Sequence, residues 1–426
     1  MPSPRLRRIF SPEPVNLILN MSFLGIARPC QASRASRFHL RSFQSQKRHF
    51  GRTQSIAAPI TAEEVQGAHK YCVALLSYDN TVPLTYPSST IRKYDRPSYT
   101  LSTFIPRHAQ SFYIALRALN VSLSMIPDTT SSPTIGLMRL QFWRDSVTKI
   151  LAGTPPKEPV AILLASAISE LHERTQGRAR ISKGWLTRII NAREQTLTND
   201  PYPNIAALES YAENTYSTLM YLTLSALPMA SVTADHVASH IGKAVGISAV
   251  LRGLPFVAFP AQPAQAPAGG AAGSAIGGGA KQGAVMLPLD VMAETGVREE
   301  DVLRYGAQAE GLRDAVFTVA TRASDHLITA QQMLSNLQAG EDVGHEFEHE
   351  GEEGHEYDVS PGTRSNESPL DEVNRAFGVF LPAVSTRLWL DRLQKQDFDV
   401  FSPELLRSEW RLPWKAYSAY RRKSLD

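Results

Sequence analysis

Cysteine is nearly absent from this sequence, whose 426 residues include only Cys30 and Cys72. A disulfide framework is therefore excluded, which suits a reducing compartment, and neither cysteine has a metal-ligand spacing around it. Long apolar runs are also lacking. No stretch of 18 uncharged apolar residues stands outside the Ala/Gly-rich residues 260–283, so we expect no membrane-spanning helix. The sequence contains no P-loop, no G-x-G-x-x-G motif and no convincing strand-like alternation.

Acidic residues are almost missing from the first 50 residues, which contain nine Lys or Arg but only one acid, Glu13. The net charge of this segment is +8, so the rest of the chain carries −5 although the whole chain carries +3. An Arg- and Ser-rich, acid-poor N-terminus is typical of a mitochondrial transit peptide. We expect residues 1–50 to be one, processed near Phe50, with a disordered basic tail as the alternative. The negative remainder argues against a nucleic-acid surface.

Apolar residues recur at steps of three and four through most of the chain, for example in residues 111–126, as a helix requires. Thr61 and Glu64 have the spacing of a capping box, whereas the turn-rich residues 80–100 predict a loop. We expect helices over residues 61–79, 111–126, 134–153, 159–175, 182–198, 204–227, 233–254, 312–337, 375–394 and 414–425. The prediction is an all-α fold of about nine to eleven helices in one bundle-like domain, residues 61–425.

Two low-complexity stretches interrupt the helical pattern. Residues 260–283 are rich in Ala, Gly and Pro, and residues 339–370 are acidic, so neither buries enough side chain to offset the entropy of ordering it. We predict that both are disordered inserts. His345, His349 and His355 lie in the acidic insert, where a solvated charged loop is favoured over a metal site because no rigid spacing supports coordination.

Five strings occur in an order that matches a known family. They are "SFYIALRALNVSLSMIPD", "IGLMRLQFWRDSV", "SYAENTYSTLMYLTLSAL", "GISAVLRGL" and "VMLPLDVMAETGV", and together they span residues 111–297. In this order the sequence resembles the squalene/phytoene synthase superfamily over about residues 65–335. The resemblance implies an isoprenoid-synthase-like helical bundle in a single domain.

Enzymes of that family hold a prenyl diphosphate through Mg²⁺, using a D-x-x-x-D pair on each of two facing helices. The i, i+4 spacing points both carboxylates of a pair in one direction, and Mg²⁺ prefers oxygen ligands. At the positions of the first motif this chain has Ser124, Met125 and Asp128, and at the positions of the second it has Gly253 and Val257. The sequence therefore predicts a catalytically silent protein with no catalytic, cofactor-binding or metal-binding residues and no cofactor. Mg²⁺ would be required only if the chain were an active prenyltransferase.

Within the superfamily, the sequence resembles most closely the non-enzymatic mitochondrial complex I assembly factor 6 group. The C-terminal string "LDRLQKQDFDVFSP", residues 390–403, extends this resemblance to about residues 65–420. It implies a role in building respiratory complex I, through binding of its subunits or assembly intermediates, at the matrix side of the inner membrane. The segment "DFDVF" or an exposed helix face could carry that contact, and peripheral contact with the membrane is a further expectation. The alternatives are a squalene/phytoene-synthase-type prenyltransferase that condenses isoprenoid diphosphates and a carrier of lipid or isoprenoid.

A residual cavity is the expected location of the remaining polar residues. Its candidates are Asp128, Arg139, Glu213, Asn214 and Arg252. If Glu213 is buried it needs a partner, and Arg252 or Arg139 is expected to supply one. For Asp128, capping of a helix is favoured.

Two further groups are predicted to be structural. His236 and His240 stand at i, i+4 but lack the Glu of a zincin motif, so a structural role is favoured over metal binding. Phe142 and Trp143 share a helix with Met138 and Leu140, and core packing is favoured there over an aromatic lining for a lipid.

Overall fold

The computed structural model describes residues 60–77, 95–227, 229, 231–260, 282–341 and 368–425. The predicted transit peptide, Cys30 and the three histidines of the acidic insert lie outside these residues, as does most of both predicted inserts. At the margins of the second insert, Ala339 ends one helix and Pro369 begins the next. Residues Ala57–Asp426 form one compact unit.

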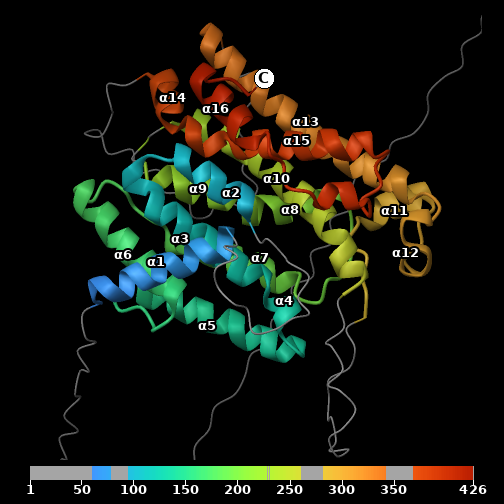
Figure 1. Ribbon diagram of the computed structural model, residues 1–426, viewed down its shortest axis with the longest axis horizontal. Helices are drawn as coiled ribbons and strands as arrows, with labels where there is room; N and C mark the ends of the chain where they lie inside the picture. Colours follow the sequence, from blue (N-terminus) through green and yellow to red (C-terminus); the bar gives the residue numbers. More distant parts are fainter. Residues whose placement is uncertain are drawn as a thin grey trace, which may run out of the picture. The chain divides into compact units, whose positions relative to one another are not determined.

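Within the described residues the chain contains sixteen α-helices and no β-strand, so the all-α prediction is confirmed (Figure 1). The helices are α1 Ala62–Ser77, α2 Arg96–Leu101, α3 Arg107–Ser124, α4 Ile126–Thr129, α5 Pro133–Leu151, α6 Pro159–Arg174, α7 Lys183–Gln195, α8 Ile205–Ala212, α9 Thr218–Ser225, α10 Val232–Ala258, α11 Leu289–Thr295, α12 Glu299–Tyr305, α13 Leu312–Ala339, α14 Pro369–Phe380, α15 Pro382–Lys395 and α16 Leu412–Arg422. A π-helical turn, η2 Glu213–Ser217, joins α8 to α9, and η1 Ser102–Phe104, η3 Gly306–Gln308 and η4 Pro403–Leu406 are short 3₁₀ turns.

Local sequence signals explain where several helices begin and end. The capping box at the start of α1 is formed: the Thr61 amide donates to Glu64 at 2.8 Å, and the Glu64 amide donates to the Thr61 hydroxyl at 3.2 Å. Ser132 caps α5 in the same way, by accepting from the amide of Ile135. Gly153 follows α5 at φ +73°, a left-handed conformation that favours glycine.

The structure also corrects the predicted boundaries. Residues 96–101 are helix α2 and not loop, because Asp95 caps a turn that Pro97 can begin. Pro127 lies in the first turn of α4, where a proline is tolerated, and the single helix predicted over 375–394 is divided at Leu381 into α14 and α15. Short helices with little periodic signal, such as α11 and α12, account for the larger number of helices.

Helix α10 lies at the centre of the packing and contacts α8, η2, α9, α13, α14 and α15 (Figure 1). Its first half belongs to an apolar core shared with α1, α3, α6 and α9, and its second half belongs to a second core shared with α11, α12 and α13. By length and apolar composition α10 would suit a bilayer, but it is largely enclosed by its neighbours here. Helix α10 is therefore the central core helix of the bundle.

Two glycines allow α10 to approach η2 and α8 closely. A Cβ placed on Gly242 would lie 2.3 Å from the Ser217 Cα, and one placed on Gly246 would lie 2.5 Å from the Ala212 Cβ. Contacts this short do not occur between real side chains, so either substitution would force the helices apart. Gly253, two turns further along α10, has nothing within 4 Å of such a Cβ.

The glycines of α10 give a matched pair of stability predictions. We expect Gly242→Ala to lower the free energy of unfolding by about 1–3 kcal/mol, because backbone atoms of η2 must move. Gly253→Ala should leave stability unchanged or raise it by up to about 1 kcal/mol, because alanine favours helix and the space is open. Urea unfolding of both variants measures the difference, and equal effects would contradict the close approach of α10 to η2.

Candidate functional site

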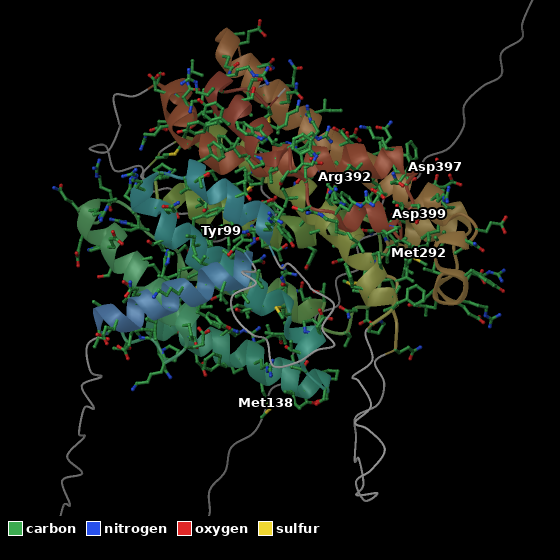
Figure 2. All side chains as sticks on the ribbon, in the orientation of Figure 1. Tyr99, Met138, Met292, Arg392, Asp397 and Asp399 are labelled. Atoms are coloured by element: carbon green, nitrogen blue, oxygen red, sulfur yellow. The ribbon has the colours of Figure 1, made fainter. Side chains whose placement is uncertain are left out.

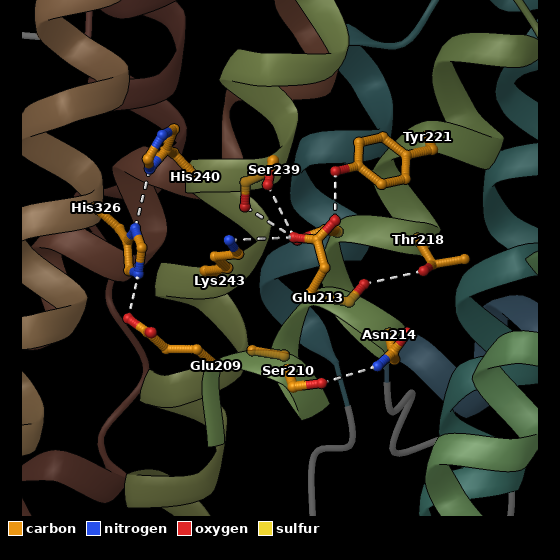
Figure 3. A network of polar contacts seen from close by, with 12 residues as sticks. Glu209, Ser210, Glu213, Asn214, Thr218, Tyr221, Ser239, His240, Lys243 and His326 are labelled. Carbon is orange, nitrogen blue, oxygen red and sulfur yellow. Dashed lines mark hydrogen bonds and ion pairs between the residues drawn. The ribbon is translucent and has the colours of Figure 1, made fainter. Parts of the chain in front are cut away.

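A polar network lies between α8, η2, α9, α10 and α13 in the interior (Figure 3). At its centre is Glu213, the first residue of the π-helical turn, whose side chain is only 13% exposed. The Tyr221 hydroxyl donates to one carboxylate oxygen at 2.6 Å and the Ser239 hydroxyl donates to the other at 2.8 Å. The Lys243 Nζ lies 4.0 Å from the same oxygen as Ser239. A buried carboxylate is thus satisfied by two hydroxyls and one cation.

The predicted pairing of Glu213 with Arg252 or Arg139 is therefore wrong. Helix geometry gives the reason for Arg252: it lies nine residues beyond Lys243 on α10, which is roughly 13 Å along the axis. Arg139 lies on the exposed side of α5 and donates to the Thr129 hydroxyl at 2.8 Å.

A second chain of contacts runs beside Glu213 and links α8, α13 and α10. The Glu209 carboxylate lies 2.8 Å from His326 Nε2, and His326 Nδ1 lies 2.9 Å from His240 Nδ1 (Figure 3). Burial alone would raise the pKa of Glu209, but hydrogen bonds from His326 and Arg322 outweigh it and lower the pKa to about 2. His240 therefore contacts a second histidine, and the ring of His236 lies 5.3 Å from it.

Four arginines from four helices occupy the interior on the other side of α10, and we call them the arginine cluster. Its members are Arg117 of α3, Arg193 of α7, Arg252 of α10 and Arg392 of α15. Arg252 and Arg392 lie on facing helices, because the Arg252 guanidinium is 5.2 Å from the ring centroid of Trp389 on α15.

Most of the cluster is held by neutral or backbone acceptors. Arg193 donates to the Asn120 side-chain oxygen at 2.9 Å and also to the hydroxyl of Tyr211. Arg392 donates to the Arg407 carbonyl at 2.7 Å, with Glu409 3.7 Å from its Nε. The Nε of Arg252 bonds the Ser248 carbonyl at 3.3 Å. The cluster thus has more positive charge than nearby carboxylate.

Asp95 and Glu409 are the acids that meet the cluster, and the Asp95 carboxylate is already bonded by Arg117 Nε at 2.8 Å. Burial lowers the pKa of Arg252, and the positive charges of Arg392 and Arg117 add to that lowering, against opposing contributions from Tyr216 and Asp95. Arg252 keeps its proton at neutral pH, since an arginine guanidinium is always charged in proteins. Because the four arginines outnumber the two nearby carboxylates, an anion placed here would be attracted.

Several buried donors around the cluster have no hydrogen-bond partner among the described residues. They are Arg193 Nε, Arg392 Nε, the Tyr202 hydroxyl, the Ser248 hydroxyl and Trp389 Nε1. A buried donor without a partner costs about 1–3 kcal/mol. Such donors commonly face a bound water or ligand, so this part of the interior is suited to a polar or anionic group.

The predicted cavity residues divide into two groups. Arg252 and Glu213 lie in the interior: Arg252 belongs to the arginine cluster and Glu213 to the neighbouring polar network. Asp128 is exposed on α4, beyond the end of α3, so it does not face the interior. Asn214 is half-buried, accepts from Arg188 and donates to the Ser210 hydroxyl at 3.3 Å.

Sequence reasoning missed Arg117, Asn120, Arg193 and Arg392. A signal for the first two was present: an arginine and an asparagine stand at i, i+3 within the otherwise apolar helix that became α3. Asn120 is 4% exposed and lies one turn before Ser124, so the inward-facing polar positions of α3 come about one turn earlier than the predicted motif.

Only one side of helix α5 packs into the core. Leu140 and Trp143 are buried, as predicted, but Phe142 and Met138 are exposed. Figure 2 labels Met138 at the outer side of α5. The exposure of Phe142 and Met138 excludes both roles considered for these two side chains, core packing and the lining of an interior pocket. A 100° step per residue turns 138 and 142 to the face of α5 opposite 140 and 143.

The donors present do not fit the Mg²⁺ site of prenyl synthases. Within the described ranges, no three His, Cys, Asp or Glu side chains gather closely enough to hold a metal ion. The side chains of the arginine cluster are cations, and the interior carboxylates Glu209 and Glu213 and the neighbouring Asp95 are already bonded by protein groups, whereas Mg²⁺ needs carboxylate oxygens that are free to bind it. We derive no metal-dependent step from this arrangement.

A surface pocket of about 570 Å³ lies at the C-terminal helices, where Asp397, Phe398, Arg313 and Phe317 are among its lining residues. Arg313 bonds Asp397 at 2.6 Å, and the rings of Phe317 and Phe398 pack edge to face with centroids 4.9 Å apart. Asp397 and Phe398 have positive φ values of 52° and 56°, which form the sharp turn after α15 (Figure 2). The first two residues of the segment "DFDVF" thus line a surface pocket.

Comparison with known protein families identifies the family of this chain. The squalene/phytoene synthase family model matches residues 91–262 and 274–418. The chain belongs to the squalene/phytoene synthase family. The match includes α3, α7, α10 and α15, the four helices that carry the arginine cluster.

Similar proteins are named for assembly and not for catalysis. The chain is 34% identical to "NADH dehydrogenase (ubiquinone) complex I, assembly factor 6" of Rattus norvegicus, with 85% of each protein covered. It is 34% identical to the Homo sapiens protein of that name, covering 80% of this chain and 82% of that one. The Drosophila melanogaster homolog is 29% identical over 73% of this chain and 75% of its own length.

Solved structures show the same fold at low sequence identity. A dehydrosqualene synthase has a TM-score of 0.56 and 13% identity, and covers 84% of this chain and 99% of its own. Squalene synthase HpnC from Alicyclobacillus acidocaldarius has a TM-score of 0.51 and 12% identity, and covers 80% and 97%. The predicted isoprenoid-synthase-like bundle is confirmed.

The lowered pKa of Glu209 predicts how stability depends on acid. Because the folded-state pKa lies below the ordinary value of 4.5, the ionised group stabilises the fold above about pH 4.5, and this contribution is lost as the pH falls towards 2. Glu209→Gln should lose up to about 3 kcal/mol of stability at pH 7. The difference in the free energy of unfolding between wild type and Glu209→Gln should shrink as the pH falls from 4.5 to 2, as measured by urea unfolding.

Glu310, which is exposed, provides the control. The free energy of unfolding of Glu310→Gln should depend on pH as that of the wild type does. A gap between wild type and Glu209→Gln that stays constant across this pH range would contradict the Glu209–His326–Arg322 network.

Proposed function

We propose that this protein is an assembly factor for mitochondrial respiratory complex I and that it is catalytically silent. The observation that supports this best is its 34% identity, over 85% of both chains, to a protein named complex I assembly factor 6. The acid-poor, arginine-rich N-terminus supports import into mitochondria. We place its action at the matrix side of the inner membrane, where it would bind complex I subunits or assembly intermediates.

The interior supports the absence of prenyl-synthase chemistry. A prenyl diphosphate carries about three negative charges, and its departure as a leaving group is assisted by metal ions held by carboxylates. Here Ser124, Gly253 and Val257 occupy the positions at which we expect those carboxylates, and Asp128 lies at the surface. The alternative of an active prenyltransferase is therefore disfavoured.

We propose the surface pocket lined by Arg313, Phe317, Asp397 and Phe398 as a contact for a complex I component. It presents the half-exposed ring of Phe317 beside Asp397, whose side chain is 81% exposed. An aromatic side chain next to a charged rim is typical of protein-binding surfaces.

Deleting the gene in its host should reduce mature complex I on native gels, and the wild-type gene should restore it. Phe317→Ala should restore at most about half as much complex I if the pocket binds a component, since aromatic anchors dominate interfaces. Phe142→Ala is the matched control, because that ring is similarly exposed, at 43% against 50%, but lies on α5. Normal complex I after deletion would overturn the assembly role.

Purified protein incubated with farnesyl or geranylgeranyl diphosphate and Mg²⁺ tests the alternative directly. We expect no condensation product, and formation of a product would reverse the choice between the two functions.

A second role, binding of an anionic ligand without metal, is favoured by the unpartnered donors beside the arginine cluster. Lipid and isoprenoid phosphates are the chemical class that such a site would take. Inorganic pyrophosphate without Mg²⁺ should raise the melting temperature of the wild-type protein, since ligands that bind only the folded state stabilise it. Arg252→Leu should abolish the shift, whereas Arg139→Leu, at an exposed position, should keep it. The same pyrophosphate shift in the wild type and Arg252→Leu would contradict this role.

A further inference from the structure

The two most exposed large apolar side chains of the described residues are Trp410 and Trp414, at 75% and 72%. Leu406 and Tyr417 stand close to them in sequence and are 67% and 53% exposed. We call Trp410, Trp414 and Tyr417 the tryptophan face. Large aromatic side chains are costly to leave in water, so a face of this kind indicates a binding surface.

The tryptophan face is fixed by the packing of α16. Trp410, Trp414 and Tyr417 follow one another at steps of four and three, which places them on one side of the helix and the turn before it. The opposite side carries Leu412, Ala416 and Ala419, all buried where α16 packs against α2 and α15. The aromatic side therefore cannot turn inward without pulling the buried side out.

Positive charge surrounds these aromatic residues. Residues 403–425 contain six Lys or Arg and two acids, a net charge of +4, whereas the rest of the chain after the first 50 residues carries −9. Both acids are already paired with arginines of the same segment, Glu404 with Arg407 at 2.8 Å and Glu409 with Arg411 at 3.1 Å. Lys415 is exposed on the helix that carries the tryptophan face.

We propose that the tryptophan face is a docking surface for a membrane that bears anionic lipid headgroups. Trp and Tyr prefer the interface between headgroups and acyl chains, and Lys and Arg are attracted by anionic headgroups. Helix α16 has 11 residues and is about 16 Å long, shorter than the roughly 30 Å hydrocarbon core, so it lies in the interface and does not cross it.

A protein partner is a poorer fit for this composition. Trp, Tyr and Arg are enriched at protein interfaces, but Lys is depleted there, and interface cores have few charges. The charge surplus around the tryptophan face is instead the composition of an interfacial amphipathic helix. The inference stands on these residues alone and does not depend on the proposed role in assembly.

The full chain can be tested by sedimentation with vesicles of phosphatidylcholine alone or with roughly 30% phosphatidylglycerol. We expect binding to the anionic vesicles at least about tenfold tighter, weakening as salt is raised. Tryptophan fluorescence should be quenched by brominated lipid. The segment before residue 51 contains no Trp, Trp143 and Trp389 are buried, and Trp185 is half-buried beside the ring of Tyr221. The part of the quenching that is lost in the Trp410→Ala/Trp414→Ala variant therefore reports on Trp410 and Trp414.

Variants distinguish vesicle binding by the tryptophan face from binding by the basic N-terminal residues, because all variants keep those residues. Trp410→Ala/Trp414→Ala should weaken binding to anionic vesicles at least about tenfold and remove the quenching. The matched control is Leu137→Ala/Met138→Ala, which removes exposed apolar side chains from α5, and it should bind as the wild type does. All these side chains are exposed, so circular dichroism and melting temperature should not change.

Three results would overturn the proposal: absence of binding to anionic vesicles, unchanged binding of the tryptophan double variant, or equal loss in the α5 control. If the tryptophan variant fails to restore complex I in deleted cells but binds vesicles normally, the face contacts a protein and the membrane proposal is wrong. Loss of vesicle binding with normal complex I would confirm membrane docking and would show that assembly of complex I does not require it.

Discussion

The close approach of α10 to the π-helical turn η2 is the constraint on which the rest of the interior depends. Without side chains at Gly242 and Gly246, the backbones come near enough for Ser217 to donate to the Ser239 carbonyl at 3.0 Å. That contact brings Ser239 and Lys243 to Glu213, which a carboxylate in the interior requires. The same helix carries His240 on one side and Arg252 further along, so its position determines both polar regions.

Charge in the interior is distributed unevenly along α10. Around Glu213 and Glu209, carboxylates are matched by hydroxyls, a lysine and a histidine, and the region is balanced. Around Arg252, cations outnumber carboxylates and several donors are left over among the described residues. Positive and negative charges are thus balanced around Glu213, whereas the region around Arg252 keeps an excess of positive charge. That excess suits the region to bind an anion, in agreement with the second role proposed above.

The sequence predicted the helical fold well because long amphipathic helices leave a periodic pattern, as α3, α5 and α13 do. It failed for α2, α11 and α12, which are too short for a period to show. For the site, it identified Glu213 and Arg252 as interior residues but misjudged their partners. Which residues meet across α10 depends on helix register and crossing, neither of which is encoded locally. Asp128 was misplaced for the same reason: α3 ends at Ser124, and a new short helix turns Asp128 outward.

The π-helical turn has a consequence for how this segment can tolerate change. A π turn is equivalent to one extra residue inserted into a continuous α-helix. The wide turn absorbs this residue, so α8 and α9 keep nearly the facing of an uninterrupted helix that is one residue shorter. Glu213 and Tyr221 are eight residues apart, yet they meet on one face, and the ring of Tyr221 lies 5.4 Å from that of Trp185. Removal of one residue from 214–217 would leave a separation of seven, close to two full helical turns, so both contacts would stay in reach while the backbone returned to ordinary helical hydrogen bonds.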